Sequence, residues 1–139
     1  MENNDVSIEI FNPDTLDKPI AQYSHAVRVE ASRLLFIAGQ LSNDRDGNIV
    51  GIGDFEKQAA QAFENVHEVL KTENLDWGNL VYCVYYLTDS RSIQKLHKFR
   101  QEHFSSMFPG AKYPPATLLV VNGLVREEFL FEVQAVAAY

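Results

Sequence analysis

The chain has 139 residues, of which 46% are hydrophobic, and its formal net charge is -7. This length suits a single domain over residues 1–139, and no apolar run approaches the roughly 18 residues that span a membrane. The charge argues against nucleic acid as a partner, because lysines and arginines are scattered and form no cluster for binding phosphates.

The first residues and the cysteine content bear on where the protein works. Residues 1–5 are polar and acidic, whereas a secretory signal begins with basic residues and continues with an apolar stretch. Cys83 is the only cysteine and cannot form an internal disulfide, which suits a reducing compartment. We therefore expect a cytoplasmic protein.

Strand signals dominate the first part of the chain. Residues 7–11 and 26–30 alternate apolar and polar side chains, which predicts strands with one buried face. Residues 34–38 are continuously apolar, a pattern typical of a strand buried on both faces. Asp54 is a candidate N-cap for a helix ending near Glu73, since apolar residues recur there every three or four positions.

The second part predicts a strand at 80–87, a helix from 90 or 91 to 104, and strands at 118–121 and 129–137. This order places two helices on one face of a six-stranded mixed sheet, which is an α+β fold. Apolar strand surface remains on the other face of such a sheet, so we expect oligomerisation.

Few known chemical motifs occur. The four histidines include no pair at the i, i+4 spacing of a helical zinc site, and Cys-x-x-Cys is absent, so no metal site is predicted. No cofactor motif is recognisable either. Cys83 lies inside a predicted strand between Val81 and Tyr85, which favours a small core residue over a nucleophile.

Two positions invite both a structural and a functional interpretation. Glu132 lies in an otherwise apolar strand, where alternation places it on one face with Leu130, Gln134 and Val136. A half-buried carboxylate at this position has two interpretations. It is a structural group, either solvated or in an ion pair, or it is a general acid or base in a cleft. The strand alone favours the structural interpretation. Gly39 ends an apolar strand. The structural interpretation is a simple transition from strand to loop, and the functional one is a close approach of the backbone to a ligand.

Several segments, in order along the chain, resemble the RidA/YjgF family, once described as L-PSP endoribonucleases. They are Tyr-Ser-His-Ala-Val at 23–27, Leu-Leu-Phe-Ile-Ala-Gly-Gln at 34–40, Gln-Ala-Ala-Gln-Ala-Phe-Glu-Asn-Val at 58–66, Tyr-Pro-Pro-Ala-Thr at 113–117 and Phe-Glu-Val-Gln-Ala-Val-Ala at 131–137. The resemblance implies a chorismate-mutase-like α+β fold and a homotrimer that binds small molecules in clefts between subunits. In deaminating members these clefts hydrolyse enamines and imines, such as 2-aminoacrylate, without a cofactor.

The resemblance also implies roles for individual residues. Glu132 matches the glutamate that positions or activates water, and this match reverses the preference drawn from the strand alone. Tyr23 matches the cleft tyrosine, and Gly39 matches the glycine that ends the buried strand. Glu132 is therefore the expected catalytic residue.

Other positions depart from the family pattern. Ala38 replaces the usual serine, His97 falls where asparagine is common, and Leu118 falls where many members have cysteine. Ala116 aligns with the arginine that binds the substrate carboxylate, and a shift by one residue puts Thr117 there instead. Loss of this charge-assisted contact would cost about ten- to a hundredfold in affinity.

Three hypotheses for function follow. The first is a deaminase whose substrate differs from 2-aminoacrylate, because the arginine is missing here as in chains of the divergent YjgH-like branch. The second is a non-catalytic small-molecule-binding or regulatory trimer, which the lost polar groups favour. The third is RNA cleavage, against which the negative charge argues. Arg91 and Arg126 are candidate replacements for the arginine, although solvated positions are expected for both.

Overall fold

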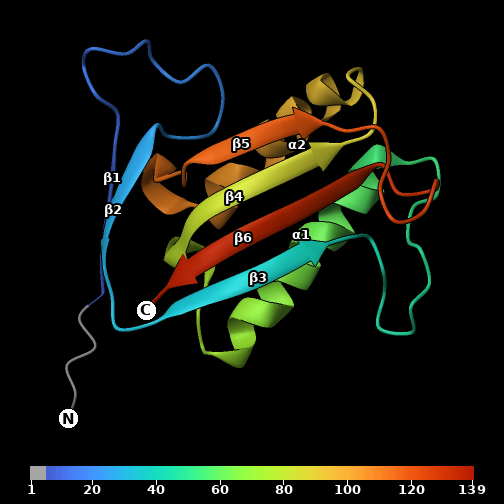
Figure 1. Ribbon diagram of the computed structural model, residues 1–139, viewed down its shortest axis with the longest axis horizontal. Coiled ribbons are helices and arrows are strands. Elements are labelled where there is room, and N and C mark those ends of the chain that lie inside the picture. Colours follow the sequence, from blue (N-terminus) through green and yellow to red (C-terminus); the bar gives the residue numbers. More distant parts are fainter. Residues whose placement is uncertain (1–5) are drawn as a thin grey trace.

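The computed structural model describes residues 6–139, so residues 1–5, on which the expectation about a signal segment rests, lie outside it. Six strands and two helices follow one another in the predicted order (Figure 1). They are β1 (Ser7–Phe11), β2 (Ala26–Glu30), β3 (Leu34–Gln40), α1 (Phe55–Thr72), β4 (Leu80–Leu87), α2 (Ser92–Met107), β5 (Ala116–Val120) and β6 (Phe131–Ala138), with short 3-10 helices at Trp77–Asn79 and Pro109–Ala111.

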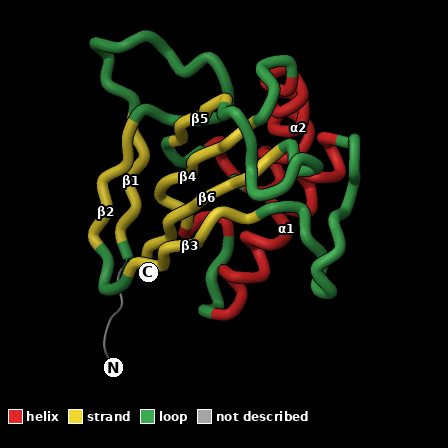
Figure 2. The backbone as a smooth tube through the Cα atoms, turned by 45° about the vertical axis from the view of Figure 1, so that its right-hand side comes forward, coloured by secondary structure: helices red, strands yellow, loops and turns green. Residues whose placement is uncertain are grey.

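The strands form two sheets, whereas one six-stranded sheet was predicted. β3, β6, β4 and β5 lie side by side in that order, with β4 and β5 parallel and the other pairs antiparallel. β1 and β2 pair only with each other, and this hairpin stands beside the larger sheet (Figure 2). Apolar alternation identifies a strand and its buried face but carries no information about its hydrogen-bonded neighbour, which is why the partition was missed.

Both helices cover the same face of the four-stranded sheet, as predicted, and lie behind it in Figure 1. The α1 helix begins at the predicted N-cap, since the side chain of Asp54 accepts a hydrogen bond of 3.1 Å from the backbone N–H of Lys57. The α2 helix extends to Met107, beyond the predicted end at Phe104. The α+β class with two helices on one face is confirmed.

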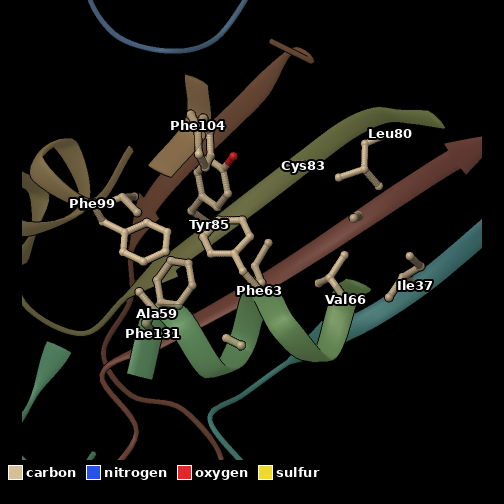
Figure 3. Packing of buried hydrophobic residues seen from close by; sticks show 14 of the residues in the cluster. Ile37, Ala59, Phe63, Val66, Leu80, Cys83, Tyr85, Phe99, Phe104 and Phe131 are labelled. Carbon is tan, nitrogen blue, oxygen red and sulfur yellow. The ribbon is translucent and has the colours of Figure 1, made fainter. Parts of the chain in front are cut away.

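Aromatic side chains fill the space between the helices and the sheet (Figure 3). The ring of Phe63 on α1 stacks on Phe99 of α2, with centroids 5.4 Å apart and planes within 8°. The rings of Phe104 and Phe131 lie 5.6 and 5.7 Å from the Phe63 ring. Phe63 therefore joins both helices to β6 at the centre of the core.

The other face of the four-stranded sheet, hereafter the outer face, carries exposed apolar side chains within residues 6–139. The prediction that β3 is buried on both faces is wrong: Ile37 is 3% exposed, but its neighbour Phe36 is 74% exposed. Leu34, Tyr82 and Leu119 also leave apolar side chains exposed. The continuous apolar run of β3 thus reflects an apolar surface rather than a second covering layer. None of the helices in residues 6–139 is long and apolar enough to cross a membrane.

Candidate functional site

A cavity of about 410 Å³ lies between β5, α2 and the segment that precedes β2. Five of the predicted site residues line it, namely Tyr23, His97, Ala116, Thr117 and Leu118. These residues come from three separate parts of the sequence, so the fold is what brings them together. The cavity is therefore the candidate ligand site of a single chain.

Parallel pairing with β4 fixes which way the β5 side chains point. Ala116 lies opposite Cys83 and Leu118 lies opposite Tyr85, whose side chains belong to the core on the helix side of the sheet. Thr117 points to the outer face, where its hydroxyl lies 2.8 Å from the hydroxyl of Tyr82. Ala116 and Leu118 thus form an apolar floor for the cavity.

The segment before β2 is held against β5 and closes one side of the cavity. Ser24, which is buried, forms an isolated parallel bridge with Pro115, and this bridge fixes the backbone next to Tyr23. The ring of Tyr23 packs edge-on against His25, with centroids 6.0 Å apart. The Nε2 atom of His25 lies 2.7 Å from the backbone oxygen of Asp17, which ties the loop back on itself.

Arg100 on α2 also lines the cavity, and sequence reasoning missed it. Its residue is only 3% exposed, and its guanidinium lies 5.7 Å from the centre of the Tyr85 ring. The Nη2 atom lies 2.9 Å from Nδ1 of His97. Arginine only donates hydrogen bonds, so Nδ1 accepts and a neutral His97 carries its proton on Nε2.

Burial, followed by the charge of Arg100, lowers the pKa of His97 below its ordinary value of 6.5. The neutral imidazole is therefore favoured at neutral pH. Burial also lowers the pKa of Arg100, but a guanidinium remains protonated in proteins. Together the two side chains form one pair in which the charge resides on Arg100.

Helical spacing was the signal for Arg100. Ile93, His97 and Arg100 recur at intervals of four and three residues, so one face of α2 presents all three to the cavity. This face of α2, which lines the cavity, was not considered in the prediction from sequence. The two arginines considered from sequence do not line the cavity: Arg91 has a side chain that is 86% exposed and bonds to Asp89, and Arg126 is exposed.

Glu132, Gly39 and Ala38 lie away from the cavity, on the β3–β6 pair. Glu132 is opposite Tyr86 on β4 and points to the outer face, as alternation predicted. Burial raises the pKa of this carboxyl above 4.5. Ala38 is exposed in the same strand as Gly39. A single chain thus separates the predicted catalytic carboxylate from the cavity residues.

A register shift in β3 accounts for the setting of Glu132. Ile37 pairs with Ala135 and Gln40 pairs with Val133, so β3 has one more residue than β6 between these pairs. Such a bulge bends a strand and re-aims its side chains. The close approach at Gly39 is made by Glu132: a Cβ built on Gly39 would lie 1.8 Å from Oε1 of the glutamate.

The possible metal ligands and the cysteine do not form a second candidate site within residues 6–139. Glu56, Glu102 and His103 are the one group of possible metal ligands found within residues 6–139, and all three are exposed. Cys83 is buried, and burial raises the pKa of its thiol to about 12. The thiol is therefore protonated at neutral pH, which agrees with a core role.

Comparison with known proteins gives consistent matches along the chain. The sequence model of a family described as endoribonuclease L-PSP matches residues 15–139. Protein DfrA of Myxococcus xanthus is 32% identical over 127 residues, which are 91% of this chain and 92% of that protein. The 2-iminobutanoate/2-iminopropanoate deaminase of Homo sapiens is 32% identical over 100 residues, 71% of this chain and 72% of its own length.

Solved structures share the fold. A protein of unknown function of the conserved Rid family, YyfB from Yersinia pestis, superposes with a TM-score of 0.85 at 26% identity, over 95% of this chain and 98% of its own. Protein YJGH superposes with a TM-score of 0.62 at 26% identity, over 84% of this chain and 83% of its own. The expected α+β architecture is therefore found in solved structures over almost the whole chain.

Proposed function

Because this chain belongs to the RidA/YjgF family, we propose that it is a hydrolytic deaminase of reactive enamine and imine metabolites. The observation that carries this proposal is the cavity lined by Tyr23, His97 and the start of β5, where the family resemblance places the substrate. A second support is the name of the similar human protein, an iminobutanoate and iminopropanoate deaminase. We assign the activity to the cytoplasm, in line with the composition.

Imine hydrolysis needs a group that moves protons. Water adds to the carbon of the C=N bond and loses a proton, and the resulting C–N bond then breaks to release ammonia and a carbonyl compound. Glu132 is suited to take the proton from water and return it to nitrogen, because burial raises the pKa of its carboxyl towards the neutral pH at which a general base works best. The neutral His97 offers Nε2–H as a further donor in the cavity.

The proposed site is completed by a second copy of the chain. In one chain Glu132 lies on the outer face, whereas the cavity opens beside β5 and α2. The apolar side chains of Leu34, Phe36 and Leu119 on the outer face favour packing against another subunit. We propose a homotrimer in which Glu132 of one subunit faces the cavity of the next.

The substrate is expected to differ from 2-aminoacrylate. Ala116 and Thr117 stand where the family has its carboxylate-binding arginine, so β5 supplies no charge there. Because the side chain of Ala116 is small, the space that the family's arginine side chain would fill is open to the ligand. A bulkier imine than 2-aminoacrylate therefore suits the cavity.

The test is deamination of imines generated in situ by amino-acid and amine oxidases, with semicarbazide trapping the imine that remains. We expect the wild-type chain to accelerate imine loss and Glu132→Gln to abolish the acceleration while leaving the oligomer intact. Glu127→Gln, on an exposed loop residue, is the matched control. Full activity of Glu132→Gln would overturn the assigned mechanism.

A binding role without turnover is the second candidate. The apolar floor made by Ala116 and Leu118 favours it, because a cavity with few polar groups suits an apolar ligand. Thermal stabilisation by imine products or analogues, without any acceleration of imine loss, would support this role. RNA cleavage is disfavoured by the net charge of -7.

A further inference from the structure

We propose that Arg100, on α2, binds the anionic group of the ligand in this cavity, and that the ligand is a small carboxylate with a short apolar side chain. The cation that the family takes from β5 thus enters the same cavity from the helix that packs beside it. Arg100 would be a specificity-determining residue for carboxylate-bearing substrates.

The surroundings of Arg100 compensate its positive charge only in part. Within residues 6–139, its guanidinium forms no ion pair with a carboxylate. Its Nε atom is buried without a hydrogen-bond partner, and the bond to His97 occupies only one of its several N–H donors. Burying an unpaired charge is costly, so a buried guanidinium beside an open cavity favours the binding of an anion there.

Comparison with two other arginines of the chain sharpens this point. Arg28 pairs with Glu9 at 2.7 Å, and Arg91 pairs with Asp89, although both arginines are exposed and could be satisfied by water. Arg100 is buried and therefore needs a counter-charge more than they do, but none of the ion pairs found in residues 6–139 includes it. The contact with the Tyr85 ring and the bond to a neutral imidazole compensate a positive charge only in part.

The rest of the cavity indicates what is attached to the anion. Ile93, Ala116 and Leu118 supply apolar walls, and the volume of about 410 Å³ accommodates more than a three-carbon acid. His97 lines the same cavity, and because its Nδ1 accepts from Arg100, its neutral ring carries a second donor, Nε2–H. A 2-imino or 2-oxo acid fits this arrangement, since its carboxylate and its neighbouring C=N or C=O group are both acceptors.

The identification of the ligand as a 2-imino acid rests on the proposed function, whereas carboxylate binding by Arg100 does not. The experiment therefore measures binding of a stable product analogue. Purified full-length protein is titrated with 2-oxobutanoate and, separately, with the neutral 2-butanone, and the dissociation constants are read from NMR chemical shifts. The variants are Arg100→Met, which keeps length but removes charge, and Arg91→Met as the control.

We expect the wild type and Arg91→Met to prefer 2-oxobutanoate, and Arg100→Met to bind it about 10- to 100-fold more weakly. Equal affinity of the wild type for the acid and the ketone, or unchanged acid binding in a folded Arg100→Met, would overturn the proposal. Wild-type binding of 2-oxobutanoate without turnover of any imine would instead remove the proposed function and leave the role of Arg100 standing.

A rescue experiment separates ligand binding from a structural role. Position 116 lines the same cavity from β5, so Ala116→Arg in the Arg100→Met background returns a cation to it. We expect the double variant to regain the preference for 2-oxobutanoate over 2-butanone. If Arg100→Met fails to fold, Arg100→Lys replaces it, and the proposal then requires weaker acid binding with unchanged affinity for the ketone.

Discussion

Oε1 of Glu132 lies 1.8 Å from the point that a Cβ on residue 39 would occupy, so the carboxylate fills the space left by the missing side chain of Gly39. Cδ and Cγ of Glu132 would lie 2.7 and 3.0 Å from the same point. The glycine therefore determines where the carboxylate rests across the β3–β6 pair. Its role is steric, because its φ angle is not in the left-handed region.

Gly39→Ala is expected to displace the Glu132 carboxylate and to reduce the proposed deaminase activity at least tenfold. The loss of stability should be small, since the atoms in conflict belong to the end of a flexible side chain. Imine turnover and urea unfolding measure the two effects separately. Gly123→Ala is the control, because an added Cβ there meets nothing within 4 Å. Full activity of Gly39→Ala would show that the position of the carboxylate is unimportant.

Glu132→Gln is expected to unfold at a higher urea concentration than the wild type at pH 7. Burial raises the pKa of Glu132 in the folded chain, so the ionised carboxylate is disfavoured there relative to the unfolded chain. This unfavourable contribution is fully present above the folded pKa and disappears as the pH falls below the ordinary value of 4.5. The stability gap should therefore narrow between pH 7 and pH 4. Glu127→Gln controls for the change in net charge.

Arg100→Met is expected to raise the pKa of His97, because it removes the second cause of its lowering while burial, the first cause, remains. The neutral form of wild-type His97 should predominate at pH 6.5 and hold its proton on Nε2. Nitrogen chemical shifts of the imidazole, followed by NMR from pH 8 to pH 5, report both quantities. A protonated Nδ1 in the neutral wild-type ring would contradict the bond from Arg100.

Phe36→Asp is expected to prevent the proposed association of subunits. Phe36 is 74% exposed on the outer face, and a carboxylate at this position would have to be desolvated in an interface. Light scattering after size-exclusion chromatography gives the mass of the particle. Val125→Asp, at a residue that is 77% exposed in a loop, should leave the mass unchanged. An intact oligomer of Phe36→Asp would exclude β3 from the interface.

Gln58→Leu is expected to lower the free energy of unfolding by about 2 kcal/mol or more, because buried polar groups lose their partners. The side-chain amide of Gln58 donates to the backbone oxygens of Gly51 and Glu128 at 3.2 and 2.8 Å, and its oxygen accepts from the N–H of Leu130 at 2.8 Å. Chemical denaturation measures the loss. Gln101→Leu, at an exposed position of α2, is the control.

The positions of the elements were predictable from sequence, because each strand and helix here carries a local signal. The N-cap Asp54, the periodicity of α1 and the alternation around Glu132 all depend on neighbours a few residues away. The division of strands between two sheets was not predictable, since the pairing of β3 with β6 joins residues about 100 positions apart. The exposure of Phe36 was missed for the same reason: an apolar run does not say what covers it.

The candidate site was predictable only in part. The family resemblance supplied Tyr23, His97 and the start of β5, which do meet at one cavity. It did not supply Arg100: Arg91 and Arg126 were considered as replacements because they lie near predicted elements of the cleft, and neither lines the cavity. Two helix positions that are separated by one turn, His97 and Arg100, become a pair only when α2 is seen to line the cavity.

The burial of Cys83 gives the chain an internal reporter of unfolding. Disulfide reagents react with an exposed thiolate, and this thiol is both inaccessible and, with a pKa of about 12, protonated at neutral pH. Labelling must then wait for β4 to leave the core, so its rate reflects the opening of the central sheet. Since the chain has one cysteine, every variant above already carries a single labelling position, and no probe needs to be introduced to rank their stabilities.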